Sequence, residues 1–221
     1  MGDEEQALLN VVVFGATGSI GGAISAELAA RGHRVVGVTR TGTGRDRLPP
    51  GLEVRPGDAT DPEDVVRWAR GCDAVISAIG PTFGTDQPQP FVAAAHALVD
   101  GLRLAGLRRL LVVGGAGSLE VSPGVQAVDT PEFPEAYRPN ALAQRQALEY
   151  YRTVDDLDWT YVSPASEIGP GDHVGDYQLG HNLMLYDDDG ISRIGYADFA
   201  DGVVDCLEQG THLRERITLA D

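Results

Sequence analysis

The residues with the clearest potential for chemistry form a glycine-rich loop near the start of the chain. Gly15, Gly18 and Gly21 are three residues apart, directly after an apolar run and at the opening of a helical pattern. The first glycine permits a tight turn, the second lets the backbone approach a pyrophosphate, and the third lets the helix pack against the strand. The helix N-terminus adds N–H donors for the anion. The loop predicts dinucleotide binding, with a simple tight turn as the alternative. The residues expected to hold the pyrophosphate are Gly15, Ala16, Thr17, Gly18, Ser19 and Ile20.

The charged residues exclude several classes of function. All 17 basic residues are arginine, and the chain contains no lysine. This excludes a Schiff-base enzyme, a pyridoxal-phosphate enzyme and a Walker-type phosphate loop, because each requires a lysine amine. With 33 acidic residues the formal net charge is −16, so neither nucleic acid nor an anionic membrane is an expected partner. The five histidines lack the spacing of a metal site, and we expect no metal.

Strands and helices that alternate along the whole chain must position these residues. Asn10–Phe14 is a run rich in β-branched residues, as expected for a strand buried on both faces. Asp61, followed by Pro62 and Glu63, is a typical helix start. Further strands are expected at residues 34–39, 52–55, 74–78, 109–113, 159–162 and 216–219. Helices are expected at residues 18–31, 61–71, 90–105, 139–153 and 197–208.

This alternation predicts the fold class. Parallel strands joined by right-handed helical crossovers form a doubly wound α/β sheet, so we expect a Rossmann-like single domain over residues 1–221. Two long connections, residues 116–138 and 164–190, both follow strands. They should therefore lie at the carboxyl edge of the sheet, where open α/β sheets bind ligands. We interpret them as loops that cover a substrate.

Five segments together resemble one protein family. The loop at residues 15–21 looks like that of extended and atypical short-chain dehydrogenases/reductases. Residues 57–61, 113–118, 158–165 and 194–200 resemble, in the right order, segments of the atypical NAD(P)H-binding, NmrA-like group. The resemblance implies a Rossmann-like fold, a nicotinamide dinucleotide cofactor and no large separate substrate domain.

The resemblance also implies how the cofactor is held. In that family the second strand ends at the adenine ribose, where an acidic residue binds the 2′-hydroxyl of NAD. Here Arg40 follows the second strand, with Arg45 and Arg47 close behind. A planar guanidinium suits a 2′-phosphate, so we expect NADP(H), with a solvated basic loop as the alternative. Asp58 and Ala59 would lie against the adenine, although a Gly-Asp pair often forms only a turn. The residues expected along the ribose and at the nicotinamide are Ala78, Ile79, Gly80 and Pro164.

The catalytic pattern of the family is incomplete in this chain. Typical short-chain dehydrogenases carry a serine after the fifth strand and a tyrosine followed four residues later by a lysine, which makes the phenol easier to ionise. Ser118 matches the serine and Tyr137 is the nearest tyrosine, but Ala141 occupies the lysine position. A phenol without that lysine suits a proton donor in a reductase better than a base in a dehydrogenase. Ser118 and Tyr137 are the candidate catalytic residues, with substrate positioning or packing as the alternative role of Tyr137.

The leading hypothesis is an NADPH-dependent oxidoreductase that reduces a small carbonyl, quinone, flavin or activated alkene. One alternative is a non-catalytic redox sensor of the NmrA-like type, which would act through a protein partner. Another is a redox-neutral isomerase or cyclase, because function depends on the site and not on the fold.

The first apolar run is too short for a signal peptide or a membrane span, so the cytoplasm is the expected location.

Overall fold

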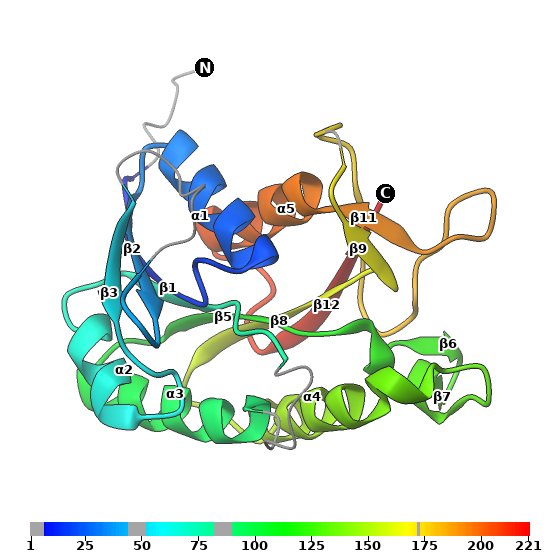
Figure 1. The fold of residues 1–221 in the computed structure, drawn as a ribbon, viewed down its shortest axis with the longest axis horizontal. Coiled ribbons are helices and arrows are strands. Elements are labelled where there is room, and N and C mark those ends of the chain that lie inside the picture. Colours follow the sequence, from blue (N-terminus) through cyan, green and yellow to red (C-terminus); the bar gives the residue numbers. More distant parts are fainter. Residues whose placement is uncertain (1–6, 44–51, 82–89, 172) are drawn as a thin grey trace.

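The computed structural model describes residues 7–43, 52–81, 90–171 and 173–221 and contains an eight-stranded sheet between two layers of helices (Figure 1). The strands lie in the order β10-β12-β8-β5-β4-β1-β2-β3. All neighbouring strands are parallel except β10, which is antiparallel to β12 at one edge. The strands are β1 (Asn10–Phe14), β2 (Arg34–Thr39), β3 (Glu53–Pro56), β4 (Ala74–Ser77), β5 (Arg109–Val113), β8 (Asp158–Pro164), β10 (Gln178–Gly180) and β12 (Glu215–Ala220).

Helices cover both faces of this sheet, and each face has its own apolar core. Helices α1 and α5 lie on one face, where Ile24 and Phe199 are buried (Figure 1). Helices α2, α3 and α4 lie on the other face, where Leu98 and Leu148 are buried. This arrangement confirms the predicted doubly wound α/β fold. The helices are α1 (Ser19–Ala30), α2 (Pro62–Ala69), α3 (Phe91–Ala105), α4 (Arg138–Tyr151) and α5 (Tyr196–Glu208).

The sheet topology creates a crevice at the carboxyl ends of the central strands. Strand β1 lies between β2 and β4. The helix that follows β1 covers one face of the sheet and the helix that follows β4 covers the other, so the chain diverges at this point. In open α/β sheets this divergence leaves space for a ligand. Every residue of β4 is buried, which makes the floor of the crevice rigid.

Local signals in the sequence explain where the helices begin. The carboxylate of Asp61 accepts a hydrogen bond of 2.9 Å from the backbone N–H of Glu63, and Pro62 occupies the first turn of α2. The predicted N-cap is therefore confirmed.

Among the described residues, no helix is long and apolar enough to cross a membrane.

The carboxyl edge differs from expectation in two ways. The sheet is not wholly parallel, because β10 adds an antiparallel strand at its edge. The two long connections also contain short regular elements, and one of these, β9, pairs in parallel with β11 further along the chain. Strands of two or three residues carry too few side chains to show a periodic pattern, so the sequence did not reveal them. These elements are η1 (Ala116–Ser118), β6 (Glu120–Ser122), β7 (Val125–Gln126), η2 (Ala127–Asp129), η3 (Glu135–Tyr137) and β9 (Glu167–Gly169); β11 is Arg193–Gly195, after the second connection.

Candidate active site

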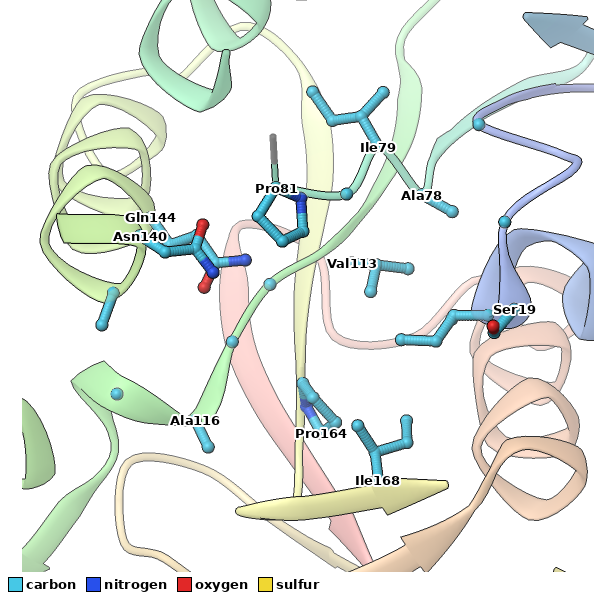
Figure 2. A pocket seen from close by; sticks show the side chains of 18 of the residues that line it. Ser19, Ala78, Ile79, Pro81, Val113, Ala116, Asn140, Gln144, Pro164 and Ile168 are labelled. Carbon is cyan, nitrogen blue, oxygen red and sulfur yellow. The ribbon is translucent and has the colours of Figure 1, made fainter. Parts of the chain in front are cut away.

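A large cleft, with a volume of about 1990 Å³, lies along the carboxyl ends of the strands. Its walls come from the loop between β1 and α1, the ends of β2, β3, β4, β5 and β8, and one face of α4. Figure 2 shows Ser19 of the first loop on one side and α4 on the opposite side. Of the fifteen residues predicted to bind cofactor or to act in catalysis, thirteen line this cleft; Ala16 and Ser118 do not.

Glycine occupies the three positions of the first loop for different structural reasons. Gly15 has a φ of +83°, and a Cβ atom there would lie 2.4 Å from the carbonyl oxygen of Ala78. A Cβ atom on Gly21 would lie 2.2 Å from the carbonyl oxygen of Gly15. Gly18 is different, because a Cβ atom there would meet only the Gly15 carbonyl oxygen, at 3.3 Å. The fold itself thus requires Gly15 and Gly21, whereas Gly18 keeps open the space above α1.

The start of α1 is suited to an anion. Gly18 is the N-cap of this helix of 12 residues, no side chain caps it, and no acidic residue lies in its first turn. Thr17, Ser19 and Ile20 line the cleft beside it. Backbone N–H groups at a helix N-terminus carry partial positive charge and bind phosphate. These residues fit the pyrophosphate of a dinucleotide. Ala16, by contrast, is fully buried. Its side chain packs against Gly37 of β2, where an added Cβ atom would lie 2.8 Å from it.

The residues after β2 and β3 line the part of the cleft where the adenosine of a dinucleotide is expected. The exposed side chain of Arg40 lines the cleft directly after β2, between Thr39 and Thr41. Arg45 and Arg47 lie outside the described residues. The Asp58 carboxylate accepts hydrogen bonds from the N–H and the hydroxyl of Thr60, at 2.9 and 2.8 Å. Asp58 therefore does form a turn, and its predicted contact with adenine stays a prediction.

The middle of the cleft is lined by backbone and small side chains. Ala78, Ile79 and Gly80 follow β4, and Pro164 ends β8 beside Val113 (Figure 2). A Cβ atom on Gly80 would meet nothing within 4 Å. The cleft is therefore open at Gly80, where the cofactor ribose is predicted to lie.

The far end of the cleft is built mainly from one face of α4. Tyr137, Asn140, Ala141 and Gln144 all line it, and they recur at the three- and four-residue spacing of one helix face. The sequence analysis identified only Tyr137. The helical spacing that starts at Tyr137 is the signal that could have found Asn140 and Gln144. Tyr137 is 54% exposed, at the entrance of α4.

The position of the missing lysine is packed against the segment that follows β5. Ala141 is buried, and a Cβ atom on Gly117 would lie 2.6 Å from the Ala141 Cβ. Small residues at both positions thus allow helix α4 to approach this segment closely. The neighbouring Arg138 serves the same packing, because its guanidinium lies 5.6 Å from the centre of the Phe133 ring and pairs with Glu135 at 2.7 Å.

Ser118 is placed away from the cleft. Ser118 is 3% exposed, and its backbone carbonyl accepts a hydrogen bond of 3.4 Å from Arg216. The buried Arg216 also donates to the Asn182 side chain at 2.8 Å, so it joins the two long connections to β12. Burial lowers the pKa of Arg216 to about 10. The surroundings of Ser118 therefore hold the loops together, and the structure does not bring its side chain into the cleft as the sequence analysis expected.

Comparison with known proteins agrees with the class of protein that this fold and cleft define. The chain belongs to the NAD(P)H-binding family, whose model matches residues 15–210. This confirms the resemblance to atypical short-chain dehydrogenases/reductases and the binding of a nicotinamide dinucleotide, and it does not distinguish NADP from NAD.

Three solved structures are similar over nearly their full length. One, described as a candidate exported protein of Burkholderia pseudomallei, is 44% identical, with a TM-score of 0.85 and coverage of 97% of this chain and 100% of that one. A candidate epimerase of Bacteroides thetaiotaomicron is 33% identical, with a TM-score of 0.87 and coverage of 97% of both chains. A candidate NADH-flavin reductase of Streptococcus pneumoniae is 34% identical, with a TM-score of 0.80 and coverage of 96% and 99%. The chain is thus similar to oxidoreductase-like proteins, and a cytoplasmic location stays a prediction.

Proposed function

We propose that this protein is an NADPH-dependent reductase of a small organic acceptor, either a carbonyl, a quinone, a flavin or an activated alkene. The observation that carries this proposal is the continuity of the cleft. One space connects Arg40, the phosphate loop and the face of α4 that begins at Tyr137. An acceptor held on α4 would therefore share the cleft with the nicotinamide end of a cofactor bound at Gly18.

The chemistry needs few groups from the protein. A reduced nicotinamide supplies a hydride when it is bound, and the acceptor takes up this hydride and one proton, so that two electrons leave the cofactor for each acceptor reduced. Tyr137 lines the cleft and carries a hydroxyl that can donate the proton. The protein otherwise orients the acceptor and excludes water. The buried Ser118 has no part in this proposal.

The preference for NADPH depends on Arg40. Its guanidinium can form charge-assisted hydrogen bonds with a 2′-phosphate, and NADH lacks that phosphate. Among the described residues that line the cleft, Arg40 is the one basic side chain. The similar protein from Streptococcus pneumoniae is named for NADH. If this protein prefers NADPH instead, Arg40 is the residue expected to account for that preference.

One observation favours a non-catalytic NADP(H) sensor as a second candidate. The position of the catalytic lysine is filled by Ala141, packed against Gly117. A protein that only reports the redox state of its cofactor needs no lysine. The sensor and the reductase share the cofactor end of the cleft and differ in whether an acceptor is reduced.

The test is turnover by the purified protein. NADPH is mixed with a panel of quinones, flavins, activated carbonyls and activated alkenes, and the loss of nicotinamide absorbance is followed. The reductase proposal expects enzyme-dependent oxidation with at least one acceptor class. Tight NADPH binding without oxidation across the panel would contradict it and would support the sensor.

A further inference from the structure

Two side-chain amides face the acceptor end of the cleft from neighbouring turns of α4. Asn140 and Gln144 are four residues apart and both line the cleft, and Figure 2 shows their side chains pointing into it from the helix. Asn140 Oδ1 is shielded from solvent, and among the described residues it has no hydrogen-bond partner. A buried acceptor without a partner is costly, so a donor supplied by a bound ligand would stabilise this group.

Gln144 is held in place by the elements around it. A Cβ atom on Gly115 would lie 2.0 Å from Gln144 Oε1, so the amide occupies the space that a side chain after β5 would take. The backbone carbonyl of Gln144 accepts a hydrogen bond of 3.2 Å from the hydroxyl of Tyr161, a fully buried residue of β8. The backbone of Gln144 is thus tied to β8, and its side-chain amide lies against Gly115, directly after β5.

The charges around these amides indicate an acceptor that is not anionic. Glu132 and Glu167 also line the cleft, together with the apolar side chains of Phe133, Met184 and Ile168. The basic side chain among the described lining residues, Arg40, follows β2 at the other end. A carboxylate or phosphate on the acceptor would meet two acidic residues and a net charge of −16 without a compensating cation nearby.

We propose that Asn140 and Gln144 determine acceptor specificity, by binding the amide or imide edge of an uncharged planar ring. A side-chain amide has a donor and an acceptor side by side, so it pairs with a ring that presents a carbonyl next to an N–H. Asn140 Oδ1 would accept from the ring N–H, and the Gln144 amide would donate to the adjacent carbonyl. This inference rests on the proposed reductase function and assigns the class of acceptor: a neutral heterocycle with such an edge, in preference to a quinone.

The test compares two uncharged rings that differ at this edge. Lumiflavin carries the imide N–H, and N3-methyllumiflavin has a methyl group in its place. Binding of each ring to the protein saturated with NADP⁺ is measured by titration of flavin fluorescence. The wild type is expected to bind lumiflavin about 10-fold more tightly, as for the loss of a single hydrogen bond. Equal affinities, or no binding of lumiflavin, would overturn the inference.

Variants assign the selectivity to the two amides. Asn140→Leu and Gln144→Met remove the polar groups at similar volume and should bring the two affinities close together. Gln146→Met is the matched control, because Gln146 is an exposed residue of α4 outside the cleft, and it should keep the wild-type preference. An unchanged NADPH affinity shows that a variant is folded. If Asn140→Leu and Gln144→Met keep the preference, the assignment is wrong.

Turnover separates this inference from the proposed function. Loss of ring selectivity in the amide variants, with NADPH oxidation by quinones retained, supports both proposals. Selective binding of lumiflavin without oxidation of NADPH by any acceptor contradicts the reductase proposal and still supports the role of the amides. Oxidation of NADPH by flavins without selectivity contradicts the amide assignment alone.

Discussion

The two ends of the cleft are built in different ways. At the phosphate end, one loop of consecutive residues supplies backbone N–H groups, and Gly18 keeps the approach to them open. At the acceptor end, side chains converge from α4, from the segment after β5 and from β9. The first end depends on backbone geometry and the second on the packing of separate elements.

This difference decides what each end tolerates. A backbone site requires glycine wherever a side chain would meet the ligand or the neighbouring strand, so its sequence is constrained and its ligand is general. A site made of side chains on a helix face can change its ligand through single substitutions at Asn140 or Gln144 while the fold stays the same. The cofactor end therefore depends on a few glycines, and the opposite end depends on side chains that single substitutions can change.

The largest expected effect is at the phosphate end. Gly18→Val puts a branched side chain above the N-terminus of α1, where it blocks the pyrophosphate. Loss of two hydrogen bonds to a charged group should weaken binding of NADPH and NADH by about 100-fold or more. Calorimetric titration measures this, and a thermal melt should show a folded protein.

Gly22→Ala is the matched control for the loop. A Cβ atom on Gly22 would lie 3.6 Å from the Ala16 carbonyl oxygen, which is an ordinary contact. This variant should bind both cofactors as the wild type does. If Gly18→Val also binds NADPH normally, the loop is a structural turn and nothing more.

The next effect tests the acceptor end. Tyr137→Phe removes the proposed proton donor and should lower kcat by about 100-fold, which is typical of general-acid catalysis. NADPH affinity should stay close to that of the wild type, because Tyr137 lies far from the phosphate loop. Tyr186→Phe, at an exposed tyrosine that does not line the cleft, serves as the control. Unchanged turnover of Tyr137→Phe would mean that water supplies the proton.

A smaller and more selective effect is expected at Arg40. Arg40→Ala should weaken NADPH binding by about 1.5–3 kcal/mol, or roughly 10- to 100-fold, and change NADH binding little. Arg34→Ala provides the comparison, because Arg34 is also exposed and lies at the opposite end of β2. Titration of both cofactors against both variants decides the matter. A wild type that prefers NADH, or an equal loss for both cofactors, would refute the assignment of NADPH.

The smallest effect concerns the missing lysine. Ala141→Lys introduces the lysine that typical short-chain dehydrogenases carry, but it places a long side chain next to Gly117. Overpacking of this kind should cost about 1–3 kcal/mol of stability without raising kcat. A thermal melt would then show a decrease in Tm of about 2–4 °C per kcal/mol. Leu142→Lys, at a partly exposed position on the same helix, should melt near the wild type. Higher turnover in Ala141→Lys would show that the position is open after all.

The sequence predicted the fold well because its strongest signals are local. The buried run Asn10–Phe14, the cap at Asp61 and the glycine loop each depend on neighbouring residues, and the structure confirms them. The burial of Ser118 could not be predicted in this way, because its surroundings include Arg216, which lies on a distant strand. The short strands β9 and β10 were missed because their pairing depends on contacts that are far apart in sequence.

The acceptor end shows the same limit for function. Asn140 and Gln144 are ordinary helical residues by sequence, and only the packing of α4 against Gly115 and Gly117 turns their face toward the cleft. The resemblance to a family directed attention to the tyrosine and the absent lysine. It could not identify the side chains that are particular to this chain.

The central claim is that the cleft holds cofactor and acceptor together for hydride transfer. The most direct test is a single-turnover measurement with NADPH that carries deuterium at one of the two hydrogens of nicotinamide C4, using each stereoisomer in turn. A cleft that holds the nicotinamide with one face toward the acceptor predicts a primary isotope effect with one stereoisomer and not with the other. Bound NADPH that stays reduced, or oxidation that shows no isotope effect with either stereoisomer, would contradict the claim.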